Sequence, residues 1–392
     1  MNWIYIVENP INQQTASLTH VLEFCHAVSK IDRVTLISQA EPNSLPDIVD
    51  YQCLQIKPIR IRPHNLGYLL STIKAYFYLQ EISRSYKPDI IYERAVGFSL
   101  GPLMFARLRN ISSVLEINGN WEDEHRLAVE QLSFPKKQLV SFINAFRGYS
   151  MILACHLAQQ VIVVTPNLAV FLHAKGIRGE NKIHIVGNGV NIERFKPLDE
   201  IKCKLDLGLH PDINYIGFVG NLALWQGVDD LISAYARLPQ ELKRKYYLLI
   251  IGSGPEYQRY MQISQELNLG NSVIFAGAKP YTSIPLYLGA CSVLAAPKRP
   301  LLSGFSPIKI FEYLACARPI LASAVEGLEF IESEKLGILF TPGDVNDLTI
   351  KLQTILNLTE EEKKEVGEIG RQYVVANHSW DAIVRTIRQY VN

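Results

Sequence analysis

Residues 215–254 read YIGFVGNLALWQGVDDLISAYARLPQELKRKYYLLIIGSG. Two short apolar runs flank a helical segment, an order that is typical of consecutive parallel strands with a covering helix. Similar runs recur on both sides of this unit, with helical segments between them. These runs are IYIV near the start, VTLIS at 34, DIIYE at 89, SVLEIN at 113, VIVVT at 161, KIHIV at 182, SVIFAG at 272, SVLAAP at 292, PILAS at 319 and GILF at 337.

The runs form two complete series, which a polar, strand-free stretch at 188–214 separates. Two series predict an α/β protein with two doubly wound, Rossmann-like domains. We expect a first domain at 1–190, a second at 191–374 and a final helix at 375–392. Ligands of such sheets bind beyond the carboxyl ends of the strands, so we expect the site in the cleft between the domains. The final helix must dock, because one of its faces is apolar, at positions 380, 383, 384, 387 and 391.

The composition excludes several classes of protein. The chain has 392 residues with 39 basic and 38 acidic side chains, a balance that argues against binding nucleic acid or a membrane mainly by charge. Its six cysteines contain no Cys-x-x-Cys pair, so we expect buried thiols in a reducing compartment. The start, MNWIYIVENP, predicts a first strand instead of a signal peptide, and we expect no transmembrane helix. We therefore expect a cytoplasmic protein.

The segment SGFSPIKIFEYLACARPILAS, residues 303–323, is the most informative for chemistry. Ser306 and Pro307 are typical of an N-cap and a first helical turn, so we expect a helix at 307–317. The free N–H groups of its first turn would form an anion site for a phosphate or diphosphate. Gly304 would let a ligand approach the main chain closely.

Two side chains of the same helix could contribute to that site. Lys309 could contact a phosphate, and Glu312 could accept hydrogen bonds from two hydroxyls, as of a ribose. An ordinary capped helix with Glu312 on the surface is the alternative.

Segments of both series resemble the family 4 retaining glycosyltransferases. GFVGNLALWQGVDDLISAYARL, IIGSGPEYQRYMQISQELNL, VIFAGAKPYTSIPLYLGACSVLAAP and FSPIKIFEYLACARPILAS have the order and spacing of that family's donor domain. Upstream, VIVVTPNLAVFLHAKGI, KIHIVGNGVNIERFKP, PDIIYERA and VLEINGNWEDE are similar to its first domain. The resemblance covers nearly the whole chain. It implies a GT-B fold, in which the first domain binds the acceptor, the second binds a nucleotide-sugar donor, and a final helix crosses back to the first.

The resemblance assigns roles around the SPIK segment. Glu312 matches the second glutamate of the family's E-x7-E motif, which binds the donor ribose. The first glutamate is replaced by Gly304, so the donor sugar would depend on main-chain groups of the intervening residues. These are Phe305, Ser306, Pro307 and Ile308.

A second departure lies in the glycine loop after YIGFVG. There the family carries an arginine and a lysine that grip the diphosphate, and this chain has Asn221 and Gln226. Because the leaving nucleoside diphosphate develops negative charge, other cations must compensate, and Lys298, Arg299 and Lys309 could do so. Lys298 and Arg299 could equally be plain loop charges. The expected donor-binding set also includes Gly220, Gly227 and Gly252.

A third departure lies in the first domain, where many members have a histidine at the position of Asn118. Asparagine can hydrogen-bond a sugar hydroxyl but cannot act as a base near pH 7. In a retaining front-face mechanism the donor's β-phosphate takes the acceptor proton, so Asn118 is compatible with activity. The catalytic set is then Asn118, Lys309 and Glu312. The expected acceptor-binding set is Asn12, Arg94, Glu116, Asn118, Trp121 and Glu122.

Some acceptor residues have plainer interpretations. Arg94 could form only a salt bridge, and Glu122 could be only solvated. The segments LGYLLSTIKAYFYLQ at 66–80 and KKQLVSFINAFRGYS at 136–150 could contact a lipid-linked acceptor, or they could be core helices.

These observations predict a cytoplasmic, retaining, metal-independent hexosyltransferase that uses a UDP- or GDP-linked sugar and a hydroxyl acceptor. We expect no nucleic-acid partner and at most peripheral contact with the inner face of the membrane. A GT-B nucleotide-sugar epimerase is one alternative. A catalytically degenerate subunit that binds a nucleotide sugar and supports a partner enzyme is another.

Overall fold

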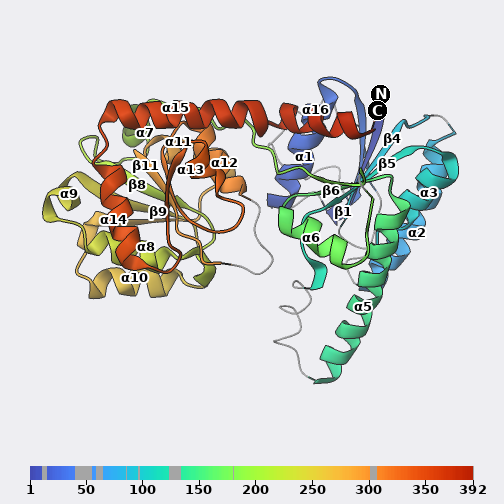
Figure 1. Cartoon of the computed structure of the whole chain (residues 1–392), viewed down its shortest axis with the longest axis horizontal. Coiled ribbons are helices and arrows are strands. Elements are labelled where there is room, and N and C mark those ends of the chain that lie inside the picture. The colour runs from blue at the N-terminus through green and yellow to red at the C-terminus, as the bar shows by residue number, and fades with distance from the viewer. Residues whose placement is uncertain are drawn as a thin grey trace. The chain divides into compact units, whose positions relative to one another are not determined.

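The structure is a computed structural model that describes residues 1–10, 16–39, 55–58, 65–84, 86–95, 98–122, 134–179, 181–300 and 307–391. The chain divides into two compact units (Figure 1). Unit 1 comprises Met1–Asn188 with Trp380–Asn392, and unit 2 comprises Gly189–Ser379. Each unit contains a parallel β-sheet with covering helices, so the predicted α/β class with two doubly wound sheets is confirmed.

The sheet of unit 1 has the strand order β3-β2-β1-β4-β5-β6-β7, and all its described pairings are parallel. Six of these strands coincide with predicted runs. The sequence did not predict β3, because its four residues, QIKP, are half polar and end in proline. The strands are β1 (Asn2–Pro10), β2 (Arg33–Gln39), β3 (Gln55–Pro58), β4 (Ile90–Arg94), β5 (Ser112–Ile117), β6 (Gln160–Val163) and β7 (Ile183–Ile185).

Helices cover both faces of this sheet. The strand order reverses at β1, so the usual right-handed crossovers would place α1 on one face and the helices that follow β3 on the opposite face. The core agrees with this arrangement: Tyr5 and Tyr92 pack against Phe24 of α1, whereas Ile4 and Ile91 belong to the cluster that contains Leu79 of α2. The helices are α1 (Ala16–Ser29), α2 (Asn65–Ile82), α3 (Gly101–Arg109), α5 (Phe134–Leu157) and α6 (Pro166–Ala174).

The final helix, α16 (Trp380–Val391), packs against α1 and belongs to unit 1. Its predicted apolar face is confirmed, because Trp380, Ile383, Val384 and Ile387 are all buried in one cluster with residues of α1. The Trp380 ring meets the Phe24 ring edge to face at 6.3 Å. The helix is therefore held mainly by apolar burial.

The sheet of unit 2 has six parallel strands among the described residues, in the order β10-β9-β8-β11-β12-β13. All six were predicted from the sequence. The strands are β8 (Asn214–Val219), β9 (Tyr246–Ile251), β10 (Val273–Gly277), β11 (Val293–Ala296), β12 (Ile320–Ser323) and β13 (Gly337–Phe340). Its helices are α7 (Glu200–Asp206), α8 (Val228–Ala236), α9 (Gln240–Lys245), α10 (Tyr257–Glu266), α11 (Ile284–Gly289), α12 (Ile308–Ala315), α13 (Phe330–Ser333), α14 (Val345–Leu356) and α15 (Glu360–Asn377).

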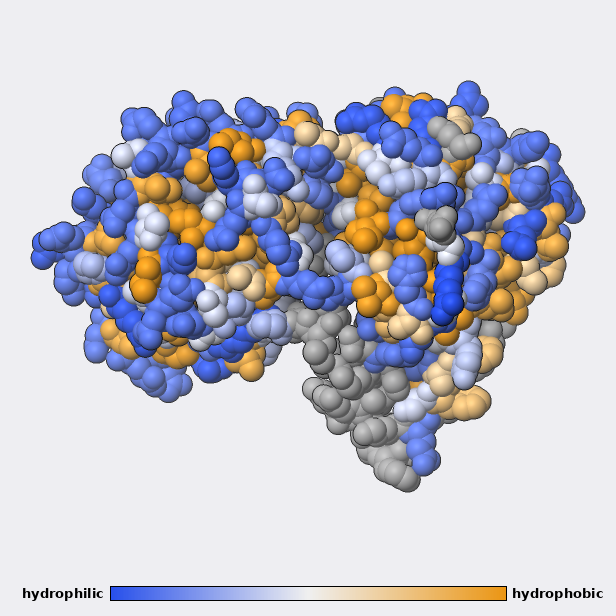
Figure 2. Space-filling view, viewed as in Figure 1, coloured by the Kyte–Doolittle hydropathy of each residue, from blue (hydrophilic) through white to orange (hydrophobic). Residues whose placement is uncertain are grey.

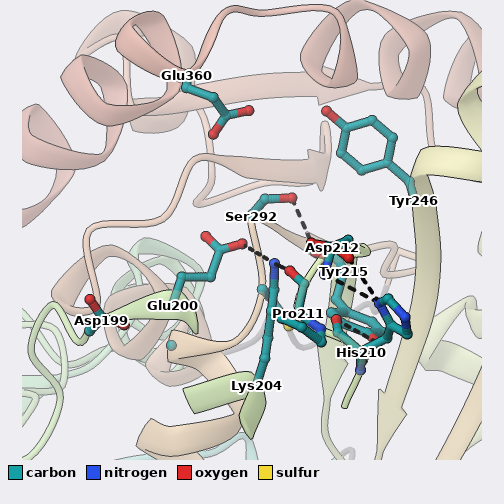
Figure 3. Close-up of polar contacts among 12 residues, drawn as sticks. Asp199, Glu200, Lys204, His210, Pro211, Asp212, Tyr215, Tyr246, Ser292 and Glu360 are labelled. Carbon is teal, nitrogen blue, oxygen red and sulfur yellow. Dashed lines mark hydrogen bonds and ion pairs between the residues drawn. The ribbon is translucent and has the colours of Figure 1, made fainter. Parts of the chain in front are cut away.

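The polar stretch between the two strand series contains helix α7, which polar contacts fasten to unit 2 (Figure 3). The Asp199 carboxylate caps this helix by accepting from the Lys202 N–H at 2.7 Å. The buried Lys204 ammonium lies 2.8 Å from the Glu200 carboxylate and donates to the Pro211 carbonyl at 3.3 Å. Because a buried ammonium needs such partners, these contacts hold the end of α7 to the loop that leads into β8.

The predicted burial of the cysteines is confirmed for the five that the structure describes, which are free thiols. Cys53 lies outside the described residues. Burial raises the pKa of Cys155 and of Cys316 to about 12. These two thiols therefore stay protonated and unreactive near pH 7.

Candidate functional site

Two glycine turns of unit 2 meet at the carboxyl ends of β8 and β9. The Gly220 N–H donates to the Ile251 carbonyl at 3.0 Å. A Cβ atom at Gly252 would lie 1.9 Å from the Gly220 carbonyl oxygen, so this main-chain approach requires glycine. A Cβ atom at Gly220 would lie 2.6 Å from the Lys309 ammonium. Three predicted donor-site residues are therefore neighbours.

Lys309, in the first turn of α12, projects toward the glycine loop. Its ammonium donates to the Gln226 side-chain oxygen at 2.8 Å and lies 4.3 Å from the centre of the Phe218 ring. Burial lowers the pKa of Lys309 to about 7, although the Glu312 carboxylate opposes this shift. Among the described residues, the hydrogen-bond partner of this ammonium is a neutral amide and not a carboxylate.

Gln226 is itself almost fully buried, at 3% exposure, at the end of the 3₁₀ turn Leu224–Gln226. Gly227 follows it with φ 63°, and a Cβ atom there would lie 1.8 Å from the Pro297 carbonyl oxygen. The turn therefore fixes Gln226 as a hydrogen-bond acceptor for a lysine that comes from another part of unit 2.

Lys298 brings a second ammonium to this side of the sheet. It follows β11 by two residues and is 5% exposed, with its ammonium 5.3 Å from the centre of the Trp225 ring. Burial, assisted by the charge of Lys309, lowers the pKa of Lys298 to about 6. Two buried ammonium groups, of which Lys309 lowers the pKa of Lys298, are an arrangement that an anion would stabilise.

Glu312 lies one turn after Lys309 and is buried, at 8% exposure. The alternative that placed Glu312 on the surface is therefore wrong. The Tyr281 hydroxyl donates to its carboxylate at 2.9 Å. Burial raises the pKa of Glu312 to about 7, against the opposing effects of the Tyr281 hydrogen bond and the Lys309 and Arg194 charges.

Arg299 has carboxylate partners in place. Its guanidinium lies 2.9 Å from the Asp229 carboxylate and 3.1 Å from the Asp230 carboxylate, both in the first turn of α8. Its main-chain N–H donates to the Trp225 carbonyl at 2.9 Å. Arg299 thus ties the loop after β11 to α8. Asn221, another predicted donor-site residue, is exposed.

The start of α12 differs by one residue from the expectation. Pro307 is the N-cap and the helix runs from Ile308 to Ala315, instead of 307–317. It ends early because Ala317 has a left-handed backbone, with φ 54°, and Pro319 disfavours helical geometry at the residue before it. Three predicted donor-site residues, Gly304, Phe305 and Ser306, lie outside the described residues.

In unit 1 a buried carboxylate, that of Glu116, has four polar side chains around it near the ends of β4 and β5. His20 Nε2 lies 2.9 Å and an Arg94 guanidinium nitrogen 3.3 Å from one of its oxygens. The Tyr92 hydroxyl and the Asn118 amide each donate to it at 2.6 Å. Burial alone would raise the pKa of Glu116, but these neighbours hold it well below its usual range. Glu116 is therefore an ionised anchor.

The contacts with Glu116 determine which hydrogen-bonding groups of Arg94 and Asn118 are available to a ligand. Because the Asn118 Nδ2 donates to Glu116, its amide oxygen is the group left to accept a hydrogen bond from a ligand. The buried Arg94 guanidinium and Glu116 carboxylate form the salt bridge that the sequence allowed as an alternative. Glu116 itself is 2% exposed, so it positions other side chains.

Trp121 and Glu122 lie elsewhere, in a pocket of about 500 Å³ against α5. Gly148 and Tyr149 of α5 line its opposite side, and Lys175 pairs with the Glu122 carboxylate. Trp121 is buried and Glu122 is exposed. The predicted acceptor-binding residues therefore divide between this pocket and the Glu116 cluster, while Asn12 lies outside the described residues.

Three residues that complete these groups, His20, Tyr92 and Tyr281, were not predicted from the sequence. Tyr281 lies 31 positions before its partner Glu312, and His20 lies in a helix far from Glu116 in the sequence. No local pattern marks such partners, because only the packing of separate elements brings them together.

Two features are absent from the described residues. They contain no group of three or more His, Cys, Asp or Glu side chains that could hold a metal ion. None of the described helices is long and apolar enough to cross a membrane.

Comparisons with known proteins agree with this architecture. Residues 202–373 match the family described as "Glycosyl transferases group 1", and residues 18–194 match "Glycosyltransferase Family 4". The chain belongs to the family 4 glycosyltransferases. Together the two matches span most of both units of this glycosyltransferase chain.

The curated relatives match this chain at low sequence identity. Sulfoquinovosyl transferase SQD2 of Arabidopsis thaliana is 23% identical over 319 residues, which are 79% of this chain and 57% of that protein. The chain spans about half the length of the curated relatives it matches.

Solved structures identify the fold as GT-B. Sucrose-phosphate synthase from Thermosynechococcus elongatus superposes with a TM-score of 0.71 and 21% identity, covering 99% of this chain and 97% of that chain. HepE of Anabaena, solved in complex with UDP, gives a TM-score of 0.73 and 19% identity, covering 99% of both chains. At these identities the likeness establishes the fold alone.

Proposed function

We propose that the chain transfers a hexose-type sugar from a nucleoside diphosphate to a hydroxyl acceptor, with retention at the anomeric carbon and without a metal ion. The observation that carries this proposal is the pair of buried ammonium groups, Lys298 and Lys309, beside the buried carboxylate of Glu312. We place the reaction in the cytoplasm, as the sequence predicts.

The donor end of the reaction fits the chemistry of unit 2. A nucleoside diphosphate brings negative charge, which would stabilise the protonated form of Lys309 and of Lys298 and offset the cost of their burial. The Glu312 carboxylate, held by the Tyr281 hydroxyl, could accept hydrogen bonds from the ribose hydroxyls. HepE, whose fold is similar, has been solved with UDP and with UDP-glucose, which supports UDP as the first nucleotide to test.

The proton of the acceptor hydroxyl needs a base, and Asn118 cannot serve as one. In the proposed mechanism the β-phosphate oxygen of the donor takes this proton as the glycosidic oxygen–carbon bond of the donor breaks. The new bond then forms on the same face of the sugar, so the configuration is retained. Lys309 and Lys298 would stabilise the charge that develops on the leaving diphosphate.

For the acceptor we propose that the Asn118 amide oxygen accepts a hydrogen bond from a hydroxyl group. The Glu116 carboxylate would fix the orientation of this amide. The pocket that Trp121 and Glu122 line would give the acceptor a second contact surface.

Titration calorimetry with UDP and GDP, followed by mass spectrometry of products from UDP-glucose, tests the proposal. We expect micromolar to millimolar binding and an α-linked product when an acceptor is supplied. Isomerised donor without acceptor would support the epimerase alternative instead. Binding without turnover across sugar, lipid-linked and small-molecule acceptors would support the degenerate subunit. No binding of either nucleotide would refute the proposal.

A further inference from the structure

Helix α5 carries an apolar stripe that the described residues leave at least half exposed, although the Phe98 ring packs against Phe146. Phe142, Phe146, Tyr149 and Leu153 recur every three or four residues, so they lie on one side of the helix. Each is at least half exposed, and Phe142 and Tyr149 reach 74%. The opposite side of α5 supplies Met151, Ala154 and Cys155 to the core. The helix therefore packs against the core on one side and exposes aromatic side chains on the other.

The neighbouring helices on this sheet face repeat the pattern. Ile73 and Phe77 of α2, and Met104 and Leu108 of α3, are spaced by four residues and exposed by 48–67%. Because α2, α3 and α5 cover the same face of the sheet, the side chains that they expose point away from it together. We call this surface of α2, α3 and α5 the outer helical face. Figure 2 shows apolar atoms exposed along α5 and beside it.

The concentration of these side chains is unusual for the molecule. The three helices carry eight of the 17 large hydrophobic side chains that are exposed in the described residues. Single exposed apolar residues are common on protein surfaces, but a group of them on three helices that contact one another in turn indicates an interaction surface.

Charge identifies the kind of partner. The three helices contain six basic residues and one acidic residue, Glu81, whereas the rest of the chain has 33 basic and 37 acidic residues. α5 contains no acidic residue, and Lys74, Arg107 and Arg109 are exposed among the apolar side chains. Two copies of this face would repel each other. Aromatic side chains interspersed with cations suit an anionic lipid surface, where rings enter the interface and cations meet the headgroups.

We propose that the outer helical face docks the protein on the surface of an anionic lipid bilayer. Phe142 and Phe146 enter the headgroup region together with the apolar side chains of α2 and α3, and Arg107, Arg109 and Lys74 pair with lipid phosphates. The near-neutral charge of the whole chain is compatible with this binding, because only the local charge lies within a screening length of the bilayer. The inference is independent of the transfer chemistry proposed above.

Co-sedimentation with vesicles tests the docking directly and needs no substrate. We expect the protein to bind phosphatidylcholine vesicles that contain phosphatidylglycerol and to bind pure phosphatidylcholine much more weakly. The triple variant Phe77→Ser, Leu108→Ser, Phe142→Ser takes one exposed side chain from each helix and should reduce the binding constant about tenfold or more. The matched control is Ile201→Ser, Leu205→Ser, Ile350→Ser, which removes three comparably exposed residues of unit 2 and should bind like the wild type.

A second pair of measurements separates charge from insertion. In Arg107→Gln, Arg109→Gln the dependence of binding on phosphatidylglycerol and on salt should weaken. Phe142→Trp should show a blue shift of its emission when anionic vesicles are added, and this single change leaves the core intact. Equal binding by the triple serine variant and the wild type would overturn the proposal. So would a vesicle-independent dimer, seen by sedimentation velocity, that the same three substitutions dissociate.

Discussion

The Gln226 side-chain oxygen accepts a hydrogen bond of 2.8 Å from the Lys309 ammonium. Gln226 stands where the family resemblance places a lysine, so a cation occupies this part of unit 2 although the loop residue is neutral. The charge comes from α12, and the loop supplies the acceptor that holds it. Where the loop lacks a lysine, the hydrogen bond between Lys309 and Gln226 thus brings an ammonium group to the same place.

Gln226 should control how much of the Lys309 charge a ligand meets. In Gln226→Glu the new carboxylate would pair with the ammonium, so we expect a higher melting temperature but a UDP affinity about tenfold lower. In Gln226→Leu the ammonium loses its acceptor, so both stability and UDP affinity should fall. Calorimetry and thermal unfolding measure both quantities, and Gln262→Glu on α10 is the exposed control. A Gln226→Glu variant with unchanged UDP affinity would contradict the role assigned to Lys309.

Tyr281 should tune the ionisation of Glu312. Its hydroxyl stabilises the charged carboxylate, so Tyr281→Phe should raise the pKa of Glu312 above its present value of about 7. At pH 7 less of the carboxylate is then ionised, and we expect the KM for the donor to rise about threefold to tenfold with a smaller change in kcat.

The pH dependence distinguishes this effect from a structural one. The KM of Tyr281→Phe should approach that of the wild type near about pH 9, where Glu312 ionises in both proteins. Tyr287→Phe is the control, because the Tyr287 ring lies near Lys279 and not beside Glu312. A defect of Tyr281→Phe that is the same at all pH values would indicate a packing role instead.

The sequence predicted the parts of the fold that have local signals. Twelve of the 13 strands of the described residues follow β-branched runs, and the apolar stripe of α16 predicted its docking. Strand β3 was not predicted because QIKP lacks that signal. Helix α12 ends at Ala315 because Ala317 has a left-handed backbone, and no side chain in the sequence indicates that conformation.

For the candidate site, residue type alone indicated Lys309 and Glu312 but not their partners. Gln226, 83 positions away, and Tyr281 contact them only through the fold. The sequence also assigned Glu116 to acceptor binding without showing that burial makes it an anchor for four neighbours. Pairings over such separations depend on tertiary packing, which a single sequence does not display.

Glu116 should contribute more to the stability of unit 1 than to direct contact with a ligand. Glu116→Gln leaves the shape but removes the charge that Arg94 faces, so we expect unit 1 to lose about 3–5 kcal/mol of unfolding free energy. Glu122→Gln, which changes an exposed carboxylate paired with Lys175, should cost less than about 1 kcal/mol. Urea denaturation measures both.

The same carboxylate predicts an acid-stability difference. Because the pKa of Glu116 in the folded protein is well below its unfolded value, its contribution is fully present above about pH 5 and is lost as the pH falls toward the folded pKa. The stability gap between the wild type and Glu116→Gln should therefore narrow only in acid. A gap that narrows already between about pH 8 and pH 6 would contradict an ionised Glu116.

Donor binding should take up protons, because a bound diphosphate favours the protonated form of Lys309. Its pKa is lowered to about 7 in the absence of ligand, and a bound diphosphate would raise it. Below the ligand-free pKa the lysine is already protonated, so binding and protonation are not coupled there. Above it each binding event must add a proton, and UDP affinity should fall as the pH rises from about 7 to about 9.

Calorimetry in buffers of different ionisation enthalpy measures this proton uptake directly. Lys309→Met should reduce the uptake and flatten the pH profile, whereas Lys279→Met, which alters a lysine outside the Lys298–Lys309 group, should leave both unchanged. Proton release instead of uptake in the wild type would mean that ionisation of Glu312 dominates the coupling, and the two ammonium groups would then not be the main contacts of the diphosphate.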